Sequence, residues 1–174
     1  NPTEAAVRAG TALYQQHQCD GLIAVGGGSA IDIAKSVAAY AGYHGALADL
    51  FGVDQVPRKG PPLIAIPTTA GTGSEVTMGA VISDHDERHK YAIMDSNLVP
   101  KYAVLDPKLT VSMPKFVTAT TGIDALTHAV ESYVTWAYNN NASNRNAEEA
   151  VVKIFRNLKR AAIDFRHAAA ALQR

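Results

Sequence analysis

The sequence has 174 residues, of which 47% are hydrophobic and 18% charged, a balance that is typical of a folded globular protein and excludes a disordered chain. Sixteen Lys and Arg residues balance sixteen Asp and Glu residues, and no basic cluster points to nucleic acid or to a membrane surface. A single cysteine excludes an internal disulfide, and no apolar run approaches the roughly 18 residues of a membrane helix. The composition therefore predicts a cytoplasmic protein that binds neither nucleic acid nor a membrane.

The amino-terminal segment has no initiator methionine and opens directly on a helix signal. Thr3 is suited to cap a helix running to about His17, because its hydroxyl can accept a hydrogen bond from an amide of the first turn. We expect the apolar stripe of this helix to be formed by the following residues: Ala6, Ala9 or Gly10, Leu13 and Tyr14. A chain that starts in this way is typical of an internal fragment.

A short apolar run at 21–25 ends in three glycines and a serine, Gly26-Gly27-Gly28-Ser29. Continuous apolar character over so few residues predicts a buried strand of a parallel sheet. A helical pattern follows at 31–38. The first part of the chain is therefore expected to be helix, strand, glycine turn and helix.

Four further apolar segments predict strands at 63–66, 81–83, 91–93 and 102–105. Pro67 stops the first of them, and a polar turn at 84–90 separates the middle pair. Strands that alternate with helices favour a parallel sheet with flanking helices.

Strand signals end near Pro114, and two helices are expected beyond it, at 121–136 and at 147–162 with a continuation to Gln173. We therefore expect an α/β nucleotide-binding domain over residues 1–114 and the beginning of an all-helical domain over residues 115–174.

The glycine turn is the first candidate for ligand binding. Glycines between a strand and a helix let the backbone approach a ligand, and the free amides at the start of the helix attract a phosphate. The spacing is not the usual dinucleotide fingerprint, because Ile31 stands where the third glycine is needed, and no Gly-Lys-Ser/Thr follows to make a P-loop. A tight turn without a ligand is the alternative.

The second candidate is the segment 68–77, rich in Thr, Gly and Ser, which follows the strand at 63–66. The carboxyl ends of strands are where open α/β sheets bind ligands, so these hydroxyls suit a nucleotide. A polar loop stabilised by its own hydroxyl groups is the alternative.

The third candidate is a carboxylate and an imidazole four residues apart, Asp124 and His128, on the expected helix at 121–136. This spacing puts both side chains on one helix face, where they can share a divalent metal. An ordinary Asp–His hydrogen bond or a solvated polar face explains the spacing equally well.

Together these segments resemble the iron-containing alcohol dehydrogenase family from Asn1 to about Ala162. The glycine turn, continued to Lys35, resembles the pyrophosphate turn of that family, and Pro67-Thr68-Thr69-Ala70-Gly71-Thr72-Gly73-Ser74-Glu75 resembles its second cofactor loop. The most specific likeness lies further along: Val104-Leu105-Asp106-Pro107, Met113-Pro114 and Thr121-Gly122-Ile123-Asp124-Ala125-Leu126-Thr127-His128-Ala129-Val130-Glu131.

The resemblance implies a dehydroquinate synthase-like architecture, in which a nucleotide-binding domain and a helical domain hold one metal in the cleft between them. It implies that Asp124 and His128 are two of four ligands and catalytic residues, with Fe²⁺ or Zn²⁺ as the metal. It implies contacts to NAD or NADP at the following positions: Asn1, Gly28, Ser29, Asp32, Thr68, Thr69, Thr72 and Lys90.

The activity implied is the interconversion of small primary alcohols and aldehydes by hydride transfer, with the alkoxide stabilised on the metal. In the family, the other two metal-binding histidines lie beyond the end of this sequence, so we expect the chain alone to be incomplete. Its uncovered apolar surfaces favour association, so we expect a homo-oligomer. Two alternatives stay open: a nucleotide-binding or scaffold fragment without catalysis, and a zinc-dependent enzyme related to glycerol dehydrogenase.

Overall fold

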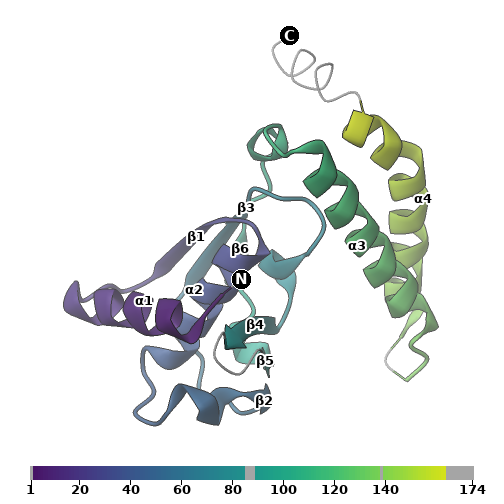
Figure 1. The fold of residues 1–174 in the computed structure, drawn as a ribbon. Helices are drawn as coiled ribbons and strands as arrows, with labels where there is room; N and C mark the ends of the chain where they lie inside the picture. The colour runs from purple at the N-terminus through teal and green to yellow at the C-terminus, as the bar shows by residue number, and fades with distance from the viewer. Residues whose placement is uncertain (1, 85–88, 138, 164–174) are drawn as a thin grey trace. The chain divides into compact units, whose positions relative to one another are not determined.

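The computed structural model describes residues 2–84, 89–137 and 139–163 (Figure 1). The chain divides into two compact units, which we call the sheet unit, Asn1–Pro67 with Gly73–Asp106, and the helical unit, Thr68–Thr72 with Pro107–Arg174. The domain boundary expected at Pro114 stays a prediction. The expected continuation of the last helix to Gln173, like residues 85–88 of the polar turn, lies outside the described residues.

The sheet unit contains two three-stranded sheets, in the orders β1-β3-β6 and β2-β5-β4. The strands of the first sheet are all parallel: β1 Leu22–Gly26, β3 Leu63–Pro67 and β6 Tyr102–Ala103. The second sheet is mixed, because β2 runs parallel to β5 whereas β4 and β5 pair as an antiparallel hairpin: β2 Gly52–Val53, β4 Gly79–Asp84 and β5 His89–Met94. Short 3-10 helices complete the unit: η1 Leu47–Leu50, η2 Ser74–Val76 and η3 Ser96–Leu98.

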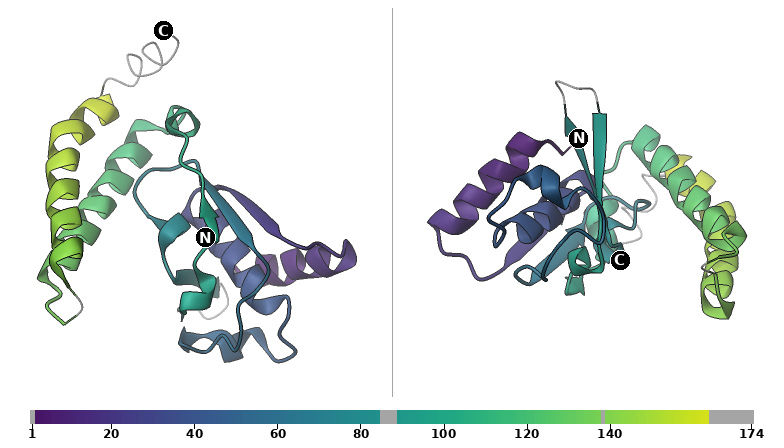
Figure 2. Two further views of the ribbon diagram at one scale, coloured as in Figure 1. Left: turned by 180° about the vertical axis from the view of Figure 1, so that it is seen from behind. Right: turned by 90° about the horizontal axis from the view of Figure 1, so that it is seen from below.

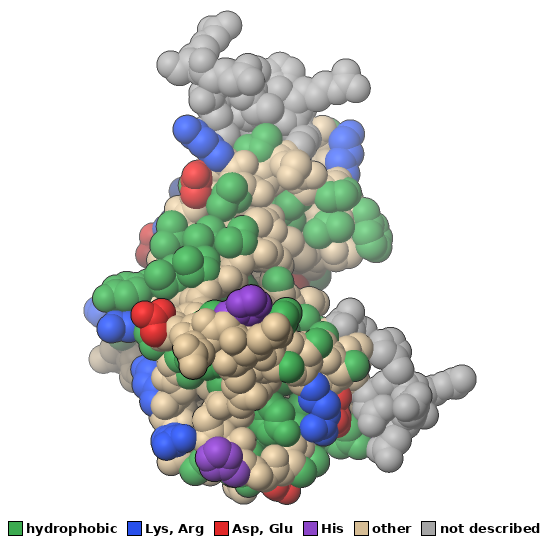
Figure 3. Space-filling model, turned by 90° about the vertical axis from the view of Figure 1, so that its left-hand side faces the viewer, with side chains coloured by type: hydrophobic (Ala, Val, Ile, Leu, Met, Phe, Trp, Pro, Cys, Tyr) green, Lys and Arg blue, Asp and Glu red, His purple; other side chains and the backbone are tan. Residues whose placement is uncertain are grey.

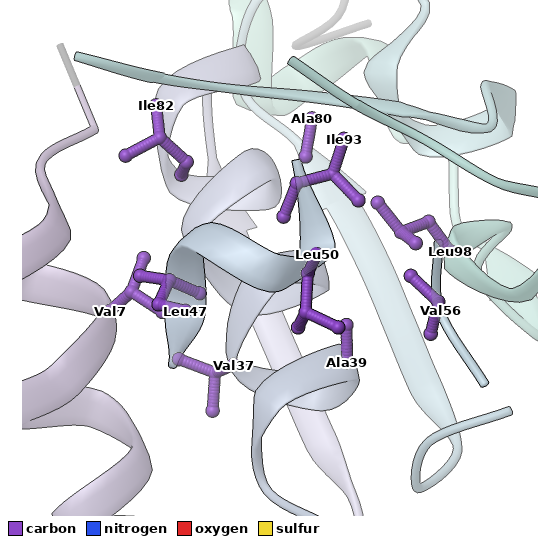
Figure 4. Close-up of a cluster of buried hydrophobic side chains, with 10 residues drawn as sticks. All are labelled: Val7, Val37, Ala39, Leu47, Leu50, Val56, Ala80, Ile82, Ile93 and Leu98. Atoms are coloured by element: carbon purple, nitrogen blue, oxygen red, sulfur yellow. The ribbon is translucent and has the colours of Figure 1, made fainter. Parts of the chain in front are cut away.

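Helix α2, Gly28–Tyr40, lies at the centre of the sheet unit and contacts strands of both sheets. Towards the parallel sheet it contributes Ile31, which packs with Ala24, Leu63 and Ala65. Its other side contributes to a larger cluster of buried hydrophobic side chains, shown in Figure 4: Val7, Val37, Ala39, Leu47, Leu50, Val56, Ala80, Ile82, Ile93 and Leu98. The predicted parallel sheet with flanking helices is confirmed, and one helix holds the two sheets together.

Helix α1, Glu4–Gln16, is capped by the Thr3 hydroxyl, which accepts from the Ala6 amide at 3.2 Å as expected. Its buried stripe differs from the expected one. Val7 and Thr11 are buried, whereas Leu13 is 56% exposed. The stripe is set by contact with α2, where Gly10 lies against Val37, and Leu13 lies outside this contact.

Strand β1 was expected to be buried, and this is wrong for one of its faces. Ala24 is buried, but Ile23 and Val25 are 68% and 58% exposed. Successive side chains of a strand point to opposite faces, and α2 packs against the face that carries Ala24. Within this unit, α2 therefore covers one face of the sheet, and the apolar side chains of β1 on the other face are exposed.

The helical unit contains helix η4, Pro107–Thr110, and a pair of long helices, α3 Lys115–Val134 and α4 Asn141–Ile163, which lie side by side in both views of Figure 2. Gly122 of α3 allows their close approach, because a Cβ at this position would collide with the side chain of Leu158. Both helices begin earlier than the expected residues 121 and 147.

Local hydrogen bonds of polar side chains accompany the early start of each helix. In the first turns of α3, threonine hydroxyls donate to carbonyls of the preceding turn, as Thr118 does to Pro114 at 3.2 Å and Thr121 to Val117 at 2.9 Å. At α4, Asn140 caps the helix, since its side-chain oxygen accepts from the amides of Ala142 and Ser143 at 2.9 and 3.0 Å. Polar residues that suggest a loop in the sequence are therefore satisfied within or next to the helix.

Apolar side chains also reach the surface in groups, as Figure 3 shows for one face of the molecule. In the helical unit Phe116, Trp136 and Phe155 are 78%, 86% and 73% exposed. Within the described residues, no helix combines the length and the apolar character needed to cross a membrane.

Candidate functional site

The glycine turn joins β1 to α2. Gly26, the last residue of β1, has φ +155°, and a Cβ there would lie 2.7 Å from the Cβ of Ala30. The N-cap of α2 is Gly27, which makes no side-chain capping hydrogen bond. The first amides of a helix have no partner within the helix, so the amides at the start of α2 are available to an anionic ligand. Gly28 is half-buried, and Ser29 is exposed at this position.

The two candidate loops follow neighbouring strands of the parallel sheet. Gly26 pairs with Pro67, so the glycine turn and the threonine-rich loop leave neighbouring strands at their carboxyl ends. Ligands of open α/β sheets bind at this edge. Each loop therefore begins at the carboxyl end of its strand, as expected.

Within the helical unit, the threonine-rich loop lies directly against α3. Gly71 has φ +153°, and a Cβ there would lie 2.6 Å from the carbonyl carbon of Thr121 and even closer to its oxygen. Thr68, Thr69 and Thr72 flank this contact and are half-buried. The contact places the loop beside α3 one turn before Asp124.

An apolar pocket of about 490 Å³ opens next to this contact. Its lining comes from the loop, from the start of the helical unit and from both long helices, and includes Gly71, Met113, Thr118, Ala125 and Leu158. The loop that resembles a cofactor loop thus forms one wall of a cavity.

Asp124 and His128 lie on one face of α3, as the spacing predicts. The distance between Asp124 Oδ2 and His128 Nε2 is 3.5 Å, and the two side chains are 47% and 57% exposed. In the described part of the chain, no third His, Cys, Asp or Glu joins them in a group able to hold a metal ion. The pair provides a hard oxygen donor and an imidazole nitrogen, a combination that suits iron or zinc.

Asp32 lies one turn into α2, and hydrogen bonds occupy both of its carboxylate oxygens. The Ser74 hydroxyl donates to one oxygen at 2.6 Å, and the amide of Val81 donates to the other at 3.1 Å. The side chain thus binds the segment that leads from the threonine-rich loop into β4. Its expected contact with the cofactor stays a prediction.

Lys35, one turn further along α2, is fully buried. Its Nζ donates to the carbonyl oxygens of Thr77 and Gly79, both at 2.8 Å, and to the Thr77 hydroxyl at 3.0 Å. Desolvation by burial lowers the pKa of Lys35 to about 8, although the carboxylates of Asp32 and Glu75 act in the opposite direction.

The candidate residues fall into two groups. Gly28, Ser29, Asp32 and Lys90 belong to the sheet unit, where Lys90 is an exposed residue of β5. The loop threonines and the Asp124–His128 pair belong to the helical unit. Asn1 lies outside the described residues.

Sequence reasoning missed Lys35 and the role of Gly71. One signal pointed to Lys35, because it is the only basic residue in the apolar stretch 31–39 and follows Asp32 by three positions. No local signal predicted the contact of Gly71 with Thr121, which depends on the packing of the loop against α3.

Comparison with known proteins places these features in a family. Residues 1–107 match the family described as iron-containing alcohol dehydrogenase, and residues 118–171 match the C-terminal part of the Fe-containing alcohol dehydrogenase family. The chain is 47% identical to 4-hydroxybutyrate dehydrogenase of Cupriavidus necator over 143 residues, which are 80% of this chain and 37% of that protein. It is 42% identical to NAD-dependent methanol dehydrogenase of Bacillus methanolicus over 134 residues, which are 77% of this chain and 35% of the relative.

A solved structure shows the same fold. Sulfoacetaldehyde reductase from Bifidobacterium kashiwanohense in complex with NAD+ superposes with a TM-score of 0.88 and 34% identity, covering 95% of this chain and 44% of that one. The chain spans less than half the length of each of these relatives. The matches extend over both units and include the glycine turn and the Asp–His helix. The chain belongs to the iron-containing alcohol dehydrogenase family, whose members share the dehydroquinate synthase-like fold.

Proposed function

We propose that this chain supplies the pyrophosphate-binding turn and two metal ligands of an NAD(P)-dependent dehydrogenase that interconverts small primary alcohols and aldehydes. The observation that carries the proposal is the start of α2, where a glycine turn at the carboxyl edge of a parallel sheet leads into a helix without a side-chain cap. Family membership supports the reaction class.

For the cofactor, the chain offers amides and small residues. The amides of Gly28 and Ser29 lie at the positive end of the α2 dipole, which favours a pyrophosphate. Gly26 allows the turn to fold tightly onto α2, because a Cβ there would lie 2.7 Å from the Cβ of Ala30. We propose that Thr68, Thr69, Thr72 and Lys90 add contacts to the same cofactor. One relative is named as NAD-dependent and a similar structure was solved with NAD+, so we favour NAD over NADP.

For the metal, Asp124 and His128 fit a divalent ion in donor chemistry and in their shared helix face. When bound, such an ion stabilises negative charge on the substrate oxygen. A bound nicotinamide would accept the hydride, with its electron pair, from the carbinol carbon, and the hydroxyl proton would be released. We propose iron as the metal because of the family, with zinc as the alternative.

The cofactor part of the proposal is tested by titrating NADH into the chain while following its fluorescence. Ser29→Glu places a carboxylate at the start of α2, where it favours the helix but repels a pyrophosphate, and we expect at least tenfold weaker binding. Ser29→Ala keeps the backbone amides and should bind like the wild type. Equal affinity of Ser29→Glu and Ser29→Ala would overturn the assignment of this turn.

The catalytic part is tested by anaerobic, NAD(P)-linked oxidation of ethanol, 1-propanol and 1,2-propanediol after reconstitution with Fe²⁺. We expect any metal-dependent turnover to be lost in Asp124→Ala and His128→Ala. Glu131→Ala removes an exposed carboxylate from the same helix and is the matched control. Turnover that survives in the first two variants would contradict their role as metal ligands.

A nucleotide-binding role without catalysis is the second candidate. It is favoured by the donor set, since two ligands hold a divalent ion weakly and the described residues offer no third. NADH binding without metal-dependent turnover would support this role for the chain alone.

We further propose that the protein acts in the cytoplasm as a homo-oligomer on a small alcohol or aldehyde, without nucleic acid or membrane partners. The zero net charge and the exposed apolar side chains support these statements. Light scattering tests the oligomeric state, and a monomer would contradict it.

A further inference from the structure

The two charged residues of α2 bind one and the same segment of chain. Asp32 and Lys35 lie on successive turns, and together they engage the segment 74–81 through Ser74, Thr77, Gly79 and Val81. Five hydrogen bonds connect this helix to residues more than 40 positions away along the chain. All of these residues belong to the sheet unit.

The geometry around Lys35 is that of a fixed ammonium group. An ammonium has three N–H donors, and three oxygen atoms of Thr77 and Gly79 lie at 2.8–3.0 Å from Nζ. Hydrogen bonds from a charged donor are stronger than neutral ones and offset part of the desolvation of a fully buried side chain. Lys35 has no exposed surface through which it could reach a substrate.

The bound segment is also attached at its far end, where Gly79–Val81 pair with β5 and Ala80 is buried in the core, whereas its first half lies near the surface. It contains the single turn of η2, and Val76, Thr77 and Met78 are exposed to solvent. Along the chain it connects the threonine-rich loop to β4, while α2 begins at the glycine turn. Helix α2 therefore begins at the glycine turn, and it also binds the segment that follows the threonine-rich loop.

We propose that Lys35 and Asp32 are positioning residues for the sheet-unit part of the cofactor site, which clamp the segment 74–81 onto α2 and so preorganise the helix that begins at the glycine turn. The effect on cofactor affinity rests on the proposed function. The clamp itself does not, because it is defined by contacts within the sheet unit. Preorganisation of this kind strengthens binding by removing the need to order a loop when the ligand arrives.

The clamp has a pH signature that an uncharged packing residue lacks. The charged groups that act on Lys35 are Asp32 on α2 and Glu75 on η2, while β1, β3 and Gly79–Ser83 of β4 contribute no ionisable side chain. The pKa of Lys35 is about 8 with the segment bound and returns towards 10.5 when the segment opens. The open form then binds more protons between these values, so opening becomes less favourable as pH rises.

The test is amide hydrogen exchange of Val76, Thr77 and Val81 in the full chain, together with NADH titration, for the wild type, Lys35→Met and Lys59→Met. Lys59 is an exposed lysine of the same unit and serves as the control. In the wild type we expect protection of these amides to rise about tenfold from pH 7 to pH 9 after correction for intrinsic exchange. Lys35→Met should lose protection, lose the pH dependence, and bind NADH at least fivefold more weakly, whereas Lys59→Met should match the wild type.

Thr77→Val provides a second variant, which removes one acceptor of Lys35 and keeps both carbonyl oxygens. It should reduce protection in the same amides, but less than Lys35→Met does. If Lys35→Met does not fold, Thr77→Val alone tests the clamp. Unchanged protection in both variants, or a pH dependence that persists without Lys35, would overturn the clamp. Failure of the wild type to bind NADH would overturn the proposed function. The exchange data would still test whether Lys35 and Asp32 hold the segment 74–81 on α2.

Discussion

The two units hold their candidate functional residues in different ways. In the sheet unit, Asp32 and Lys35 are tied by hydrogen bonds to residues distant in the chain, and the helix that carries them is largely buried. In the helical unit, Asp124 and His128 contact each other at 3.5 Å on an exposed helix face. Among the described residues, few hydrophobic side chains of the helical unit are buried: Met113, Ala129 and Ala147.

This difference separates two kinds of site. The glycine turn is fixed by the packing of the chain itself, so its geometry exists before any ligand arrives. The Asp124–His128 pair takes its spacing from α3, and both side chains are exposed among the described residues. We therefore expect substitutions in the clamp and at close contacts to change stability, and substitutions of the proposed metal ligands Asp124 and His128 to change ligand binding only.

The largest effect is expected at Gly71, where the helical unit does have a close contact. Gly71→Ala forces a Cβ against the backbone of Thr121 at a φ that side chains rarely adopt, and should lower the free energy of unfolding by on the order of 4 kcal/mol. Urea unfolding followed by circular dichroism measures the change. Gly73→Asn is the control, because φ is +62° and the nearest atom to a Cβ is 4.0 Å away, so this variant should lose less than about 1 kcal/mol. Similar losses in both variants would show that the loop does not depend on this contact.

A smaller effect is expected from the buried ammonium. Because the pKa of Lys35 is about 8 in the folded protein and 10.5 without burial, the unfolded chain binds more protons between these values. Stability contributed through Lys35 is therefore fully present above pH 10.5 and is lost as pH falls towards 8. The free energy of unfolding of the wild type should rise by about 2 kcal/mol relative to Lys35→Met between pH 7.5 and pH 9.5. Urea titrations of both proteins at these two pH values measure it, and parallel curves would contradict the burial of a charged lysine.

The sequence allowed the main elements to be predicted because their signals are local. The apolar runs at β1 and β3 marked strands, the glycines between β1 and α2 marked the turn, and the four-residue spacing of Asp124 and His128 marked a common helix face. Each of these conclusions needs only the period of an element or the conformation of a few residues. Each candidate loop could be assigned to the end of its own strand for the same reason.

The remaining features depend on contacts between distant segments. Lys35 reads as an ordinary helix residue until Thr77 and Gly79 are placed beside it. The exposure of Ile23 and Val25 depends on which face of the sheet a helix covers, and an apolar run is the same in either case. The early start of α4 depends on Asn140, one of several asparagines in a stretch that resembles a loop.

The contact between α3 and α4 allows the two units to be tested for independence. Leu158→Ala removes a half-buried side chain that lies against Gly122, and should cost about 1.5 kcal/mol. Hydrogen exchange should show the loss in α3 and α4, with the amides of β4 and β5 unchanged. Phe155→Ala is the control, because Phe155 is 73% exposed and its removal should change stability little. Loss of protection in the sheet unit would show that the two units unfold together.

The smallest effect on stability is expected at the proposed metal ligands. Asp124 and His128 are both exposed, and ion pairs of this kind contribute little, so His128→Ala should change the free energy of unfolding by less than about 0.5 kcal/mol. The same variant should abolish a Co²⁺ or Zn²⁺ titration signal measured by calorimetry, because one of the two donors is removed. A strongly destabilised His128→Ala variant would mean that His128 stabilises the fold, as the Lys35 clamp does. Retention of stability with loss of metal binding would instead assign these two residues to ligand binding, as their exposure and spacing on α3 indicate.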